Sequence, residues 1–566
     1  MSNGWERSAF MNEETATPPH LHRFHRFRSR ELALLLVVVT SCIAYVLSEG
    51  VRFGDSITYA NEIRSGGLIE PGHLLWRPLG YVIGHALGTL DTYSSALWTL
   101  QGLCLAASVI GVVAIYVLCR NVAGPGIALF VAALSAVSNG YWVYAFSGCS
   151  YTLGVLFQTL ALHYAIRERQ ASHRCRNALA AGAFGGLAVS AWAINALASP
   201  AILLALITAT ADSCKRMQQS SRKAAAFALG YFTTCVLPIV LAFMLIHNAP
   251  RWRVGLRTSS SLAFAQWLST ARHDVPVHFG VTQLLRAAMG WAQSVISLSD
   301  VGYRLRLWHL GEGAFPVSLW SLVVPLFYVG VLVLAAILVR GESRLDTRSR
   351  SLIYASAFAL GLNLAFGAAW QSTDLERYMP SWPFQMLLLT IALNLLWERV
   401  ERVPLISLAS TSAVAALVIV NWQGTFKPVL DANSYRSLWV TAIRQHASRG
   451  DVVVVFGQRK SVIVPPHDGN FPRIDNLSDE IQKGGTRWRS LEINEIRLTQ
   501  SRGGRVFLAD SLFWLDSAPR DGWSFKEYPM PTPREIHDAF MPFKSETIAF
   551  TVGRERVWAA RMDTAQ

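Results

Sequence analysis

Charged residues are scarce in this chain. Only 16% of its 566 residues are Asp, Glu, Lys or Arg, whereas 52% are hydrophobic and the mean hydropathy is +0.30. Soluble domains carry about 25% charged residues, so this composition excludes an ordinary cytosolic enzyme. It also excludes a disordered chain, because disorder requires low hydrophobicity and high charge.

Cysteine is absent from the last part of the chain. None of the seven cysteines lies after Cys235, and none shows the close paired spacing of a zinc site or a redox pair. The C-terminal region therefore has no disulfide framework. His20, His22 and His25 lie among arginines in a polar tail, which favours an anchor beside anionic lipid over a metal site. We expect no metal and no cofactor.

What the chain has instead is long apolar runs. Several of them approach or reach the roughly 20 residues that span a hydrocarbon core. They include Leu32–Leu47, Leu97–Leu118, Ser318–Val339 and Leu405–Val420. The sequence therefore predicts a polytopic α-helical membrane protein.

The net charge of +14 reflects orientation in the membrane rather than a nucleic-acid partner. From Gln423 onward there are 20 Lys and Arg against 17 Asp and Glu, so the membrane part contributes +11. Its basic residues sit in short loops, which the positive-inside rule places in the cytoplasm. These loops are Arg23–Arg30, Arg120, Arg167–Arg176, Lys215–Lys223, Arg340–Arg350 and Glu398–Arg402.

Placing every basic loop on one face predicts about eleven transmembrane helices in a multi-pass protein of the inner or plasma membrane. Residues 1–30 form a cytoplasmic basic tail that does not resemble a cleavable signal. Residues 31–422 form the membrane module, and residues 423–566 form an extracytoplasmic domain. The N-terminus is then inside and the C-terminus outside.

Three loops on the predicted outer face, residues 49–92, 247–316 and 370–383, are candidates for function. Long ordered loops in compact proteins are usually functional. The second has helical spacing of apolar residues at Leu284, Leu285, Ala288 and Trp291, which predicts amphipathic helices lying in the interface.

The chemistry of the chain changes after Trp422. Residues 435–447 suit a helix, and four later runs are rich in β-forming residues. These runs are Val452–Phe456, Arg505–Ala509, Thr547–Val552 and Arg556–Ala560. We expect a small α/β domain without a glycine-rich phosphate loop or a catalytic triad, and its role stays open.

The first outer loop contains Asp55 a few residues after the first span, at the membrane boundary. Partial desolvation there tends to raise the pKa of a carboxylate, which suits a base that accepts the proton of an incoming hydroxyl. The alternative is that Asp55 caps a helix running through Tyr59 and Ile63, and residue type alone favours the cap.

A second polar cluster on the same predicted face contains Asp374, Glu376, Arg377 and Tyr378, directly before a span. A guanidinium binds phosphate in a forked geometry, so Arg377 can hold a lipid phosphate. The alternative is an interfacial arginine beside an aromatic belt. Asp374 and Glu376 superficially resemble a metal-diphosphate site for a nucleotide sugar, but they face away from the cytoplasm.

These two clusters resemble the GT-C superfamily of membrane glycosyltransferases, near the protein O-mannosyltransferase and aminoarabinose-transferase groups. The matching segments are Gly54–Ser56, His73–Leu79 with Leu74 in place of the usual proline, Arg377–Pro380, Trp142–Tyr144 and Ser150–Leu153. The resemblance covers roughly residues 31–425. Related sequences often carry an acid just before the tyrosine that matches Tyr151, whereas Cys149 and Ser150 stand here. A second catalytic or metal-binding carboxylate is therefore not expected at this turn.

The resemblance implies that a hexosyl or pentosyl group moves, with inversion, from a polyprenyl-phosphate carrier to an acceptor outside the cell. Asp55 would be the base and Arg377 the main phosphate-binding group, with Arg77 or His73 secondary and Asp374 and Tyr378 nearby. The partners would be this donor, membrane lipids and a lipid, glycan or protein acceptor. The rivals are a transporter or flippase and an inactive assembly scaffold. Transporters usually bury ionisable groups within spans, and the spans here contain essentially none.

Overall fold

The structure, a computed structural model, describes part of the chain at residue level. The described residues are 19–47, 54–68, 70, 72–168, 175–208, 213–238, 281–296, 347–369, 375–397, 403–423, 438–456, 470–477, 481, 487–513, 531–552 and 555–561. The apolar run Ser318–Val339 and the site candidate Asp374 lie outside them. For Asp55 the backbone is described and the side chain is not.

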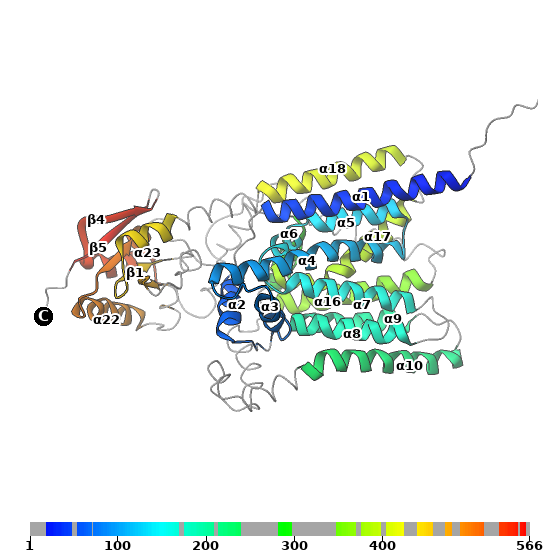
Figure 1. The fold of residues 1–566 in the computed structure, drawn as a ribbon, viewed down its shortest axis with the longest axis horizontal. Coiled ribbons are helices and arrows are strands. Elements are labelled where there is room, and N and C mark those ends of the chain that lie inside the picture. The colour runs from blue at the N-terminus through cyan, green and yellow to red at the C-terminus, as the bar shows by residue number, and fades with distance from the viewer. Residues whose placement is uncertain are drawn as a thin grey trace, which may run out of the picture.

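The described residues up to 423 form a helical bundle, which Figure 1 shows with most long helices roughly side by side. Its first half contains α1 (Pro19–Leu47), α2 (Gly54–Ser65), α3 (Trp76–Ala86), α4 (Tyr93–Arg120), α5 (Pro125–Val137), α6 (Asn139–Ala145) and α7 (Tyr151–Glu168). Then follow α8 (Arg176–Ala191), η1 (Ala193–Ala198), α9 (Ser199–Ile207), α10 (Ser213–Tyr231), η2 (Phe232–Val236), α13 (Val281–Val295), α16 (Thr347–Ala369), η4 (Leu375–Ser381), α17 (Trp382–Trp397) and α18 (Val403–Asn421). These helices confirm the prediction that this part of the chain is α-helical.

Among the described residues, three helical stretches are long and apolar enough to cross a membrane. They are α4, residues 349–369 of α16, and the stretch Leu375–Trp397 that joins η4 to α17. A fourth results if α5 and α6, which bend by 63° at their junction, form one broken span. The number eleven stays a prediction.

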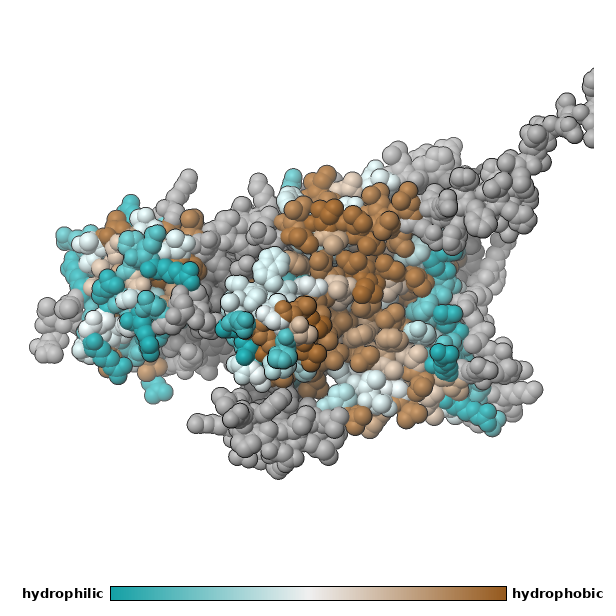
Figure 2. All heavy atoms as spheres, in the orientation of Figure 1, coloured by the Kyte–Doolittle hydropathy of each residue, from teal (hydrophilic) through white to brown (hydrophobic). Residues whose placement is uncertain are grey.

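The outer surface of the bundle is apolar, as a lipid-facing surface must be. Leu32, Leu36 and Leu47 of α1 are each about two-thirds exposed, and Trp98 and Ile110 of α4 are exposed as well. Figure 2 shows the resulting brown band around the middle of the bundle, with hydrophilic residues gathered towards its ends. Exposure of these apolar side chains to water would be unfavourable, whereas their exposure to the hydrocarbon of a bilayer is not.

Helices α8 and α10 approach each other closely because glycines line their contact. A Cβ atom added at Gly182 would overlap the backbone carbonyl of Phe227, with the carbonyl carbon at 2.8 Å. Gly186, one turn on, meets the backbone of Tyr231 at 2.6 Å in the same test, and Gly230 of α10 meets the backbone of α8. Small residues four apart allow close backbone approach where lipid offers no hydrophobic driving force.

We expect Gly182→Ala to destabilise the protein by roughly 1–3 kcal/mol, because the added methyl group meets rigid backbone. Thermal unfolding of the purified protein in detergent measures this. Gly102→Ala in α4 is the matched control, since nothing lies within 4 Å of its added Cβ. Equal stability of the two variants would show that the α8–α10 contact tolerates separation.

One predicted amphipathic helix differs from expectation in the face that it buries. Helix α13 forms in the second loop and packs against α6, α16 and η4. Trp291 is buried as predicted, but Leu284 is 42% exposed, and the buried side is completed by Ala287 and Val295. Hydropathy does not distinguish a face that contacts protein from one that contacts lipid, because both environments accept leucine.

The described residues between 438 and 561 form a mixed sheet flanked by helices. Its strands are β1 (Val452–Val455), β2 (Arg473–Asn476), β3 (Val506–Ala509), β4 (Lys544–Val552) and β5 (Glu555–Ala560), in the order β2-β1-β3-β5-β4. Strands β2, β1 and β3 are parallel, and β5 is antiparallel to β3 and β4. The helical elements are residues 438–446, α22 (Trp488–Ser501), η7 (Asp510–Phe513), α23 (Pro533–Phe540) and η8 (Met541–Phe543).

Four of these strands and the helix before them lie where the sequence predicts them. Strand β2 was not predicted, because its residues Arg473–Asn476 are mostly polar and carry no β-forming run. It is held by parallel pairing with β1 instead. The two faces of the sheet bury separate apolar clusters, centred on Val454 and Leu508 on one side and Val453 and Phe507 on the other.

Candidate functional site

The first loop (residues 49–92) is attached to the bundle through its backbone. The Leu75 N–H donates to the Ser190 carbonyl at 2.8 Å, and the Ala193 N–H donates to the Gly72 carbonyl at 2.9 Å. Ser190 and Ala193 lie on either side of the break between α8 and η1. The segment from Gly72 to Leu75, which contains His73, is therefore held against a fixed point. Figure 1 shows α2 and α3 side by side at one end of the bundle.

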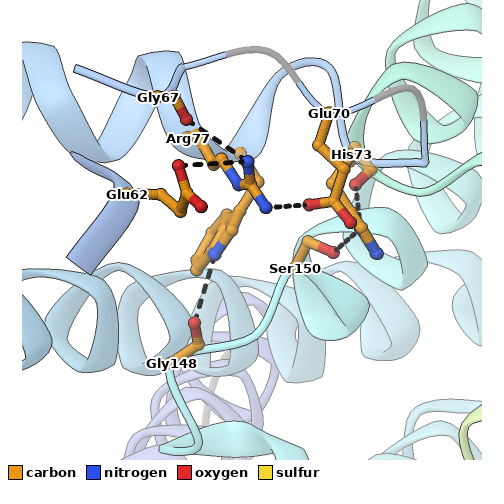
Figure 3. A network of polar contacts seen from close by, with 9 residues as sticks. Glu62, Gly67, Glu70, His73, Arg77, Gly148 and Ser150 are labelled. Atoms are coloured by element: carbon orange, nitrogen blue, oxygen red, sulfur yellow. Dashed lines mark hydrogen bonds and ion pairs between the residues drawn. The ribbon is translucent and has the colours of Figure 1, made fainter. Parts of the chain in front are cut away.

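Arg77 is buried and bound within the first loop. Its guanidinium forms ion pairs with Glu70 at 2.9 Å and Glu62 at 3.9 Å, and it donates to the Gly67 carbonyl at 3.3 Å. It also lies over the ring of Tyr59, 5.3 Å from the centroid. Figure 3 shows the two carboxylates on either side of the guanidinium. Arg77 therefore organises the loop, because two acids already neutralise its charge.

His73 is buried and contacts two parts of the chain. Its Nδ1 lies 3.2 Å from the Ala191 carbonyl and 2.7 Å from the Ser150 hydroxyl (Figure 3). A carbonyl oxygen only accepts, so we assign the ring proton to Nδ1, which leaves the lone pair on Nε2. Burial is the main cause that lowers the pKa of His73 to about 3; the charges of Arg77 and Arg377 act in the same direction, and the bond to Ala191 acts against it. His73 is thus neutral near pH 7.

We expect the protein to lose stability as the pH falls from 6.5 towards 3, because the unfolded chain then protonates His73 while the folded chain does not. The loss reaches about 2 kcal/mol at pH 5. His73→Asn keeps an N–H donor for Ala191 but does not titrate, so its thermal unfolding should depend less on pH. Identical pH profiles of the two proteins would mean that His73 binds its proton as readily in the folded chain as in the unfolded chain.

The turn between α6 and α7 lies next to both α2 and α3. Trp76 Nε1 donates to the Gly148 carbonyl at 3.1 Å. Gly148 has φ of 88°, and a Cβ there would lie 3.2 Å from the Cβ of Ser56. This turn therefore contacts the residue directly after Asp55. Ser150 of the same turn bonds to His73.

Aromatic rings surround His73. Tyr59 and Tyr151 lie edge-on to it, with centroids 5.5 Å and 6.0 Å away, and Tyr151 in turn contacts Tyr144 and Trp192 at 4.7 Å each. These rings come from α2, α7, α6 and the end of α8. These rings limit the contact of His73 with water. Their contacts also connect the four elements.

The late cluster forms η4 and packs against α6, α7, η1, α13 and α16. Arg377 and Tyr378 are buried, and Arg377 pairs with Glu376 at 2.8 Å. The tight 3₁₀ turn contains Pro380, whose ring cannot enter a regular α-helix without the loss of a bond. Helix η4 packs against η1, whose Ala193 N–H bonds to the Gly72 carbonyl of the first loop, so η1 lies next to both clusters.

The structure thus brings together His73 and the Ser150–Tyr151 turn, and the charges of Arg77 and Arg377 act on His73. The backbone of Asp55 lies in the first turn of α2, one turn before Tyr59, while its side chain is outside the description. The sequence did not identify Glu62 and Glu70 as partners of Arg77. Their presence in the same loop was the only available signal, since loop residues have no periodicity from which pairing can be predicted.

Comparison with known proteins identifies the fold. No family model and no curated protein sequence shows significant similarity to the chain. Among solved structures, archaeal oligosaccharyltransferase AglB from Archaeoglobus fulgidus, in complex with an inhibitory peptide and a dolichol-phosphate, has TM-score 0.46 and 13% identity, covering 84% of this chain and 69% of that one. ArnT from Cupriavidus metallidurans bound to undecaprenyl phosphate has TM-score 0.50 and 11% identity, covering 93% of this chain and 97% of that one. The predicted GT-C resemblance is thereby confirmed at the level of the fold, since the match to the ArnT structure covers 93% of this chain.

Proposed function

We propose that this protein is a membrane glycosyltransferase that moves a sugar from a polyprenyl-phosphate donor to an acceptor at the extracytoplasmic face. The fold that it shares with ArnT supports this proposal, because the solved ArnT structure holds undecaprenyl phosphate. No nucleotide sugar is expected outside the cell, so a donor activated on a lipid that reaches the site from the bilayer is the consistent choice.

The contacts that both the first loop and η4 make with η1 support the proposal. Arg77 and Arg377, about 300 residues apart in sequence, both act electrostatically on the neutral His73. Arg77 pairs with Glu62 and Glu70 of its own loop, and Arg377 pairs with Glu376. A site for a lipid phosphate needs fixed positive charge at the membrane boundary, and Arg377 of η4 supplies it.

The proposed reaction is a single displacement. The acceptor oxygen attacks the anomeric carbon while Asp55 takes its proton, and the bond between that carbon and the phosphate oxygen breaks. The electron pair leaves with the lipid phosphate, whose added charge Arg377 stabilises. The leaving phosphate needs no proton, so one base suffices, and direct displacement inverts the anomeric configuration.

The other site residues have supporting roles in this proposal. His73 is neutral, so it contributes no charge to the phosphate and instead offers Nε2 as a hydrogen-bond acceptor to the substrate. Arg77 holds the loop that follows α2, and Tyr378 fixes η4 against Gly367 of α16. Asp374 remains a proposed substrate-binding residue. The transferred group is a hexosyl or pentosyl unit.

We expect proteoliposomes that contain the protein to transfer sugar from a polyprenyl-phosphate sugar to an added acceptor. Product detection by mass spectrometry checks this, with empty liposomes as the control. Movement of the lipid or sugar across the bilayer without a covalent product would favour the transporter. The absence of both, across a panel of lipid-linked donors and acceptors, would favour the scaffold.

A further inference from the structure

A polar cavity of about 530 Å³ lies at the edge of the C-terminal sheet where β1, β2 and β3 begin. Two turns form its sides, residues 448–451 before β1 and residues 502–505 before β3. Arg473 at the start of β2 and Glu495 of α22 complete it. Because these three strands are parallel, their first residues gather at one edge and bring distant turns together.

The two turns are rigidly built. Gly450 and Gly503 have φ of 99° and 79°, in the left-handed region that glycine enters without strain. The Asp451 carboxylate accepts from the Ser448 N–H at 2.9 Å, the Arg505 N–H at 2.8 Å and the Arg505 guanidinium at 2.7 Å. Although burial alone would raise it, these bonds hold the pKa of Asp451 below its usual value. Asp451 therefore stays ionised and joins the turns.

The cavity carries an excess of positive charge. Four arginines line it, namely Arg449, Arg473, Arg502 and Arg505, against two acids, Asp451 and Glu495. Arg505 pairs with Asp451, and Arg473 pairs with Glu495 and with Asp475. Arg449 and Arg502 are exposed and form no ion pair with any residue in the described part of the chain. Two guanidiniums on facing turns therefore remain available to a ligand.

We propose that this arginine pocket binds a phosphate dianion carried by a small molecule or a lipid headgroup. Two available guanidiniums match the charge of a phosphate monoester, which is about −1.5 to −2 at pH 7. Forked donors fit its oxygens in a bidentate manner. The cavity volume falls within the range of about 300–1,000 Å³ that holds small ligands. The site is separate from the proposed transfer site and does not depend on it.

The test uses the full-length protein in phosphatidylcholine nanodiscs and measures hydrogen exchange in residues 448–452 and 502–505. In one arm, glycerol 3-phosphate is titrated against sodium chloride of equal ionic strength. In the other, phosphatidic acid is included in the nanodisc without soluble phosphate. Slower exchange in the first arm alone assigns the site to a soluble phosphate ester, and slower exchange in the second alone assigns it to a lipid headgroup. Slowing in both supports the shared chemistry.

Substitution distinguishes this pocket from general attraction of anions. The double variant Arg449→Gln/Arg502→Gln should weaken binding at least about tenfold, since hydrogen bonds from charged groups contribute roughly 1.5–3 kcal/mol each. The control Arg489→Gln/Arg556→Gln removes the same charge from exposed positions that do not line the pocket. The proposal is overturned if neither phosphate slows exchange, if chloride acts equally, or if the control variant loses as much affinity.

Discussion

Asp55→Asn is expected to lower the rate of sugar transfer by about 10²–10⁴-fold, the range typical of a lost general base. Asparagine has nearly the same shape as aspartate but cannot take the proton of the attacking hydroxyl. The first turn of α2 retains a polar side chain, so expression and thermal stability should change little. Initial rates with a lipid-linked donor, measured at saturating acceptor, provide the comparison.

Asp91→Asn is the matched control for this experiment. Asp91 lies in the same loop but is exposed, and its backbone carbonyl, rather than its side chain, accepts from Arg64 at 3.0 Å. Its substitution should leave the rate unchanged. Turnover of the Asp55 variant within tenfold of the wild type would remove Asp55 as the base. The alternative role for Asp55, a cap of the helix that runs through Tyr59 and Ile63, would then remain, and its backbone lies in the first turn of that helix, α2.

Arg377→Gln is expected to lower kcat by about 10²–10³-fold, as loss of one group that stabilises developing charge does in other enzymes. In this variant the charge on the departing phosphate would lose the fixed guanidinium that stabilises it. Burial of the site strengthens such an electrostatic interaction, so its loss should be large. Arg377→Lys keeps the charge but not the fork, so it should recover part of the rate. Rates as a function of donor concentration separate kcat from KM.

Two further variants show whether the loss of kcat in Arg377→Gln arises from the chemical step or from a change in the fold. Arg77→Gln should mainly reduce thermal stability, because it leaves Glu62 and Glu70 near each other without their shared cation. Arg120→Gln, at the exposed end of α4, should alter neither property. If Arg377→Gln unfolds at the same temperature as the wild type and retains its kcat, Arg377 anchors η4 and does not bind the leaving phosphate.

Local patterns predicted the elements of this protein well. The apolar runs Leu32–Leu47 and Leu97–Leu118 became α1 and α4, and four β-rich runs after Trp422 became strands. Each depends on neighbours a few residues apart, so periodicity and composition contain the needed information. The exception is β2, whose polar residues become a strand only because β1 lies beside them.

The candidate site was only partly predictable. His73, Arg77 and Arg377 were identified, but their charge states and partners were not. Arg77 seemed equivalent to Arg377 in sequence, whereas the folded loop places Glu62 and Glu70 beside it. His73 is uncharged near pH 7 because the break after α8 and the turn at Ser150 enclose it. Such partners come from distant segments, and no local rule specifies them.

The sequence by itself determined that this is a membrane-embedded helical protein and that its residue composition changes after Trp422. Hydropathy is a property of each residue, so it can be read directly from the sequence. Tertiary structure alone decided that η1 lies next to both η4 and the first loop, that Glu62 and Glu70 pair with Arg77, and that four arginines converge at one sheet edge. The physical reason is that electrostatic interactions depend on distance in space. The distance between two residues that are hundreds of positions apart is set by how their segments pack. The order of the residues along the chain does not reveal it.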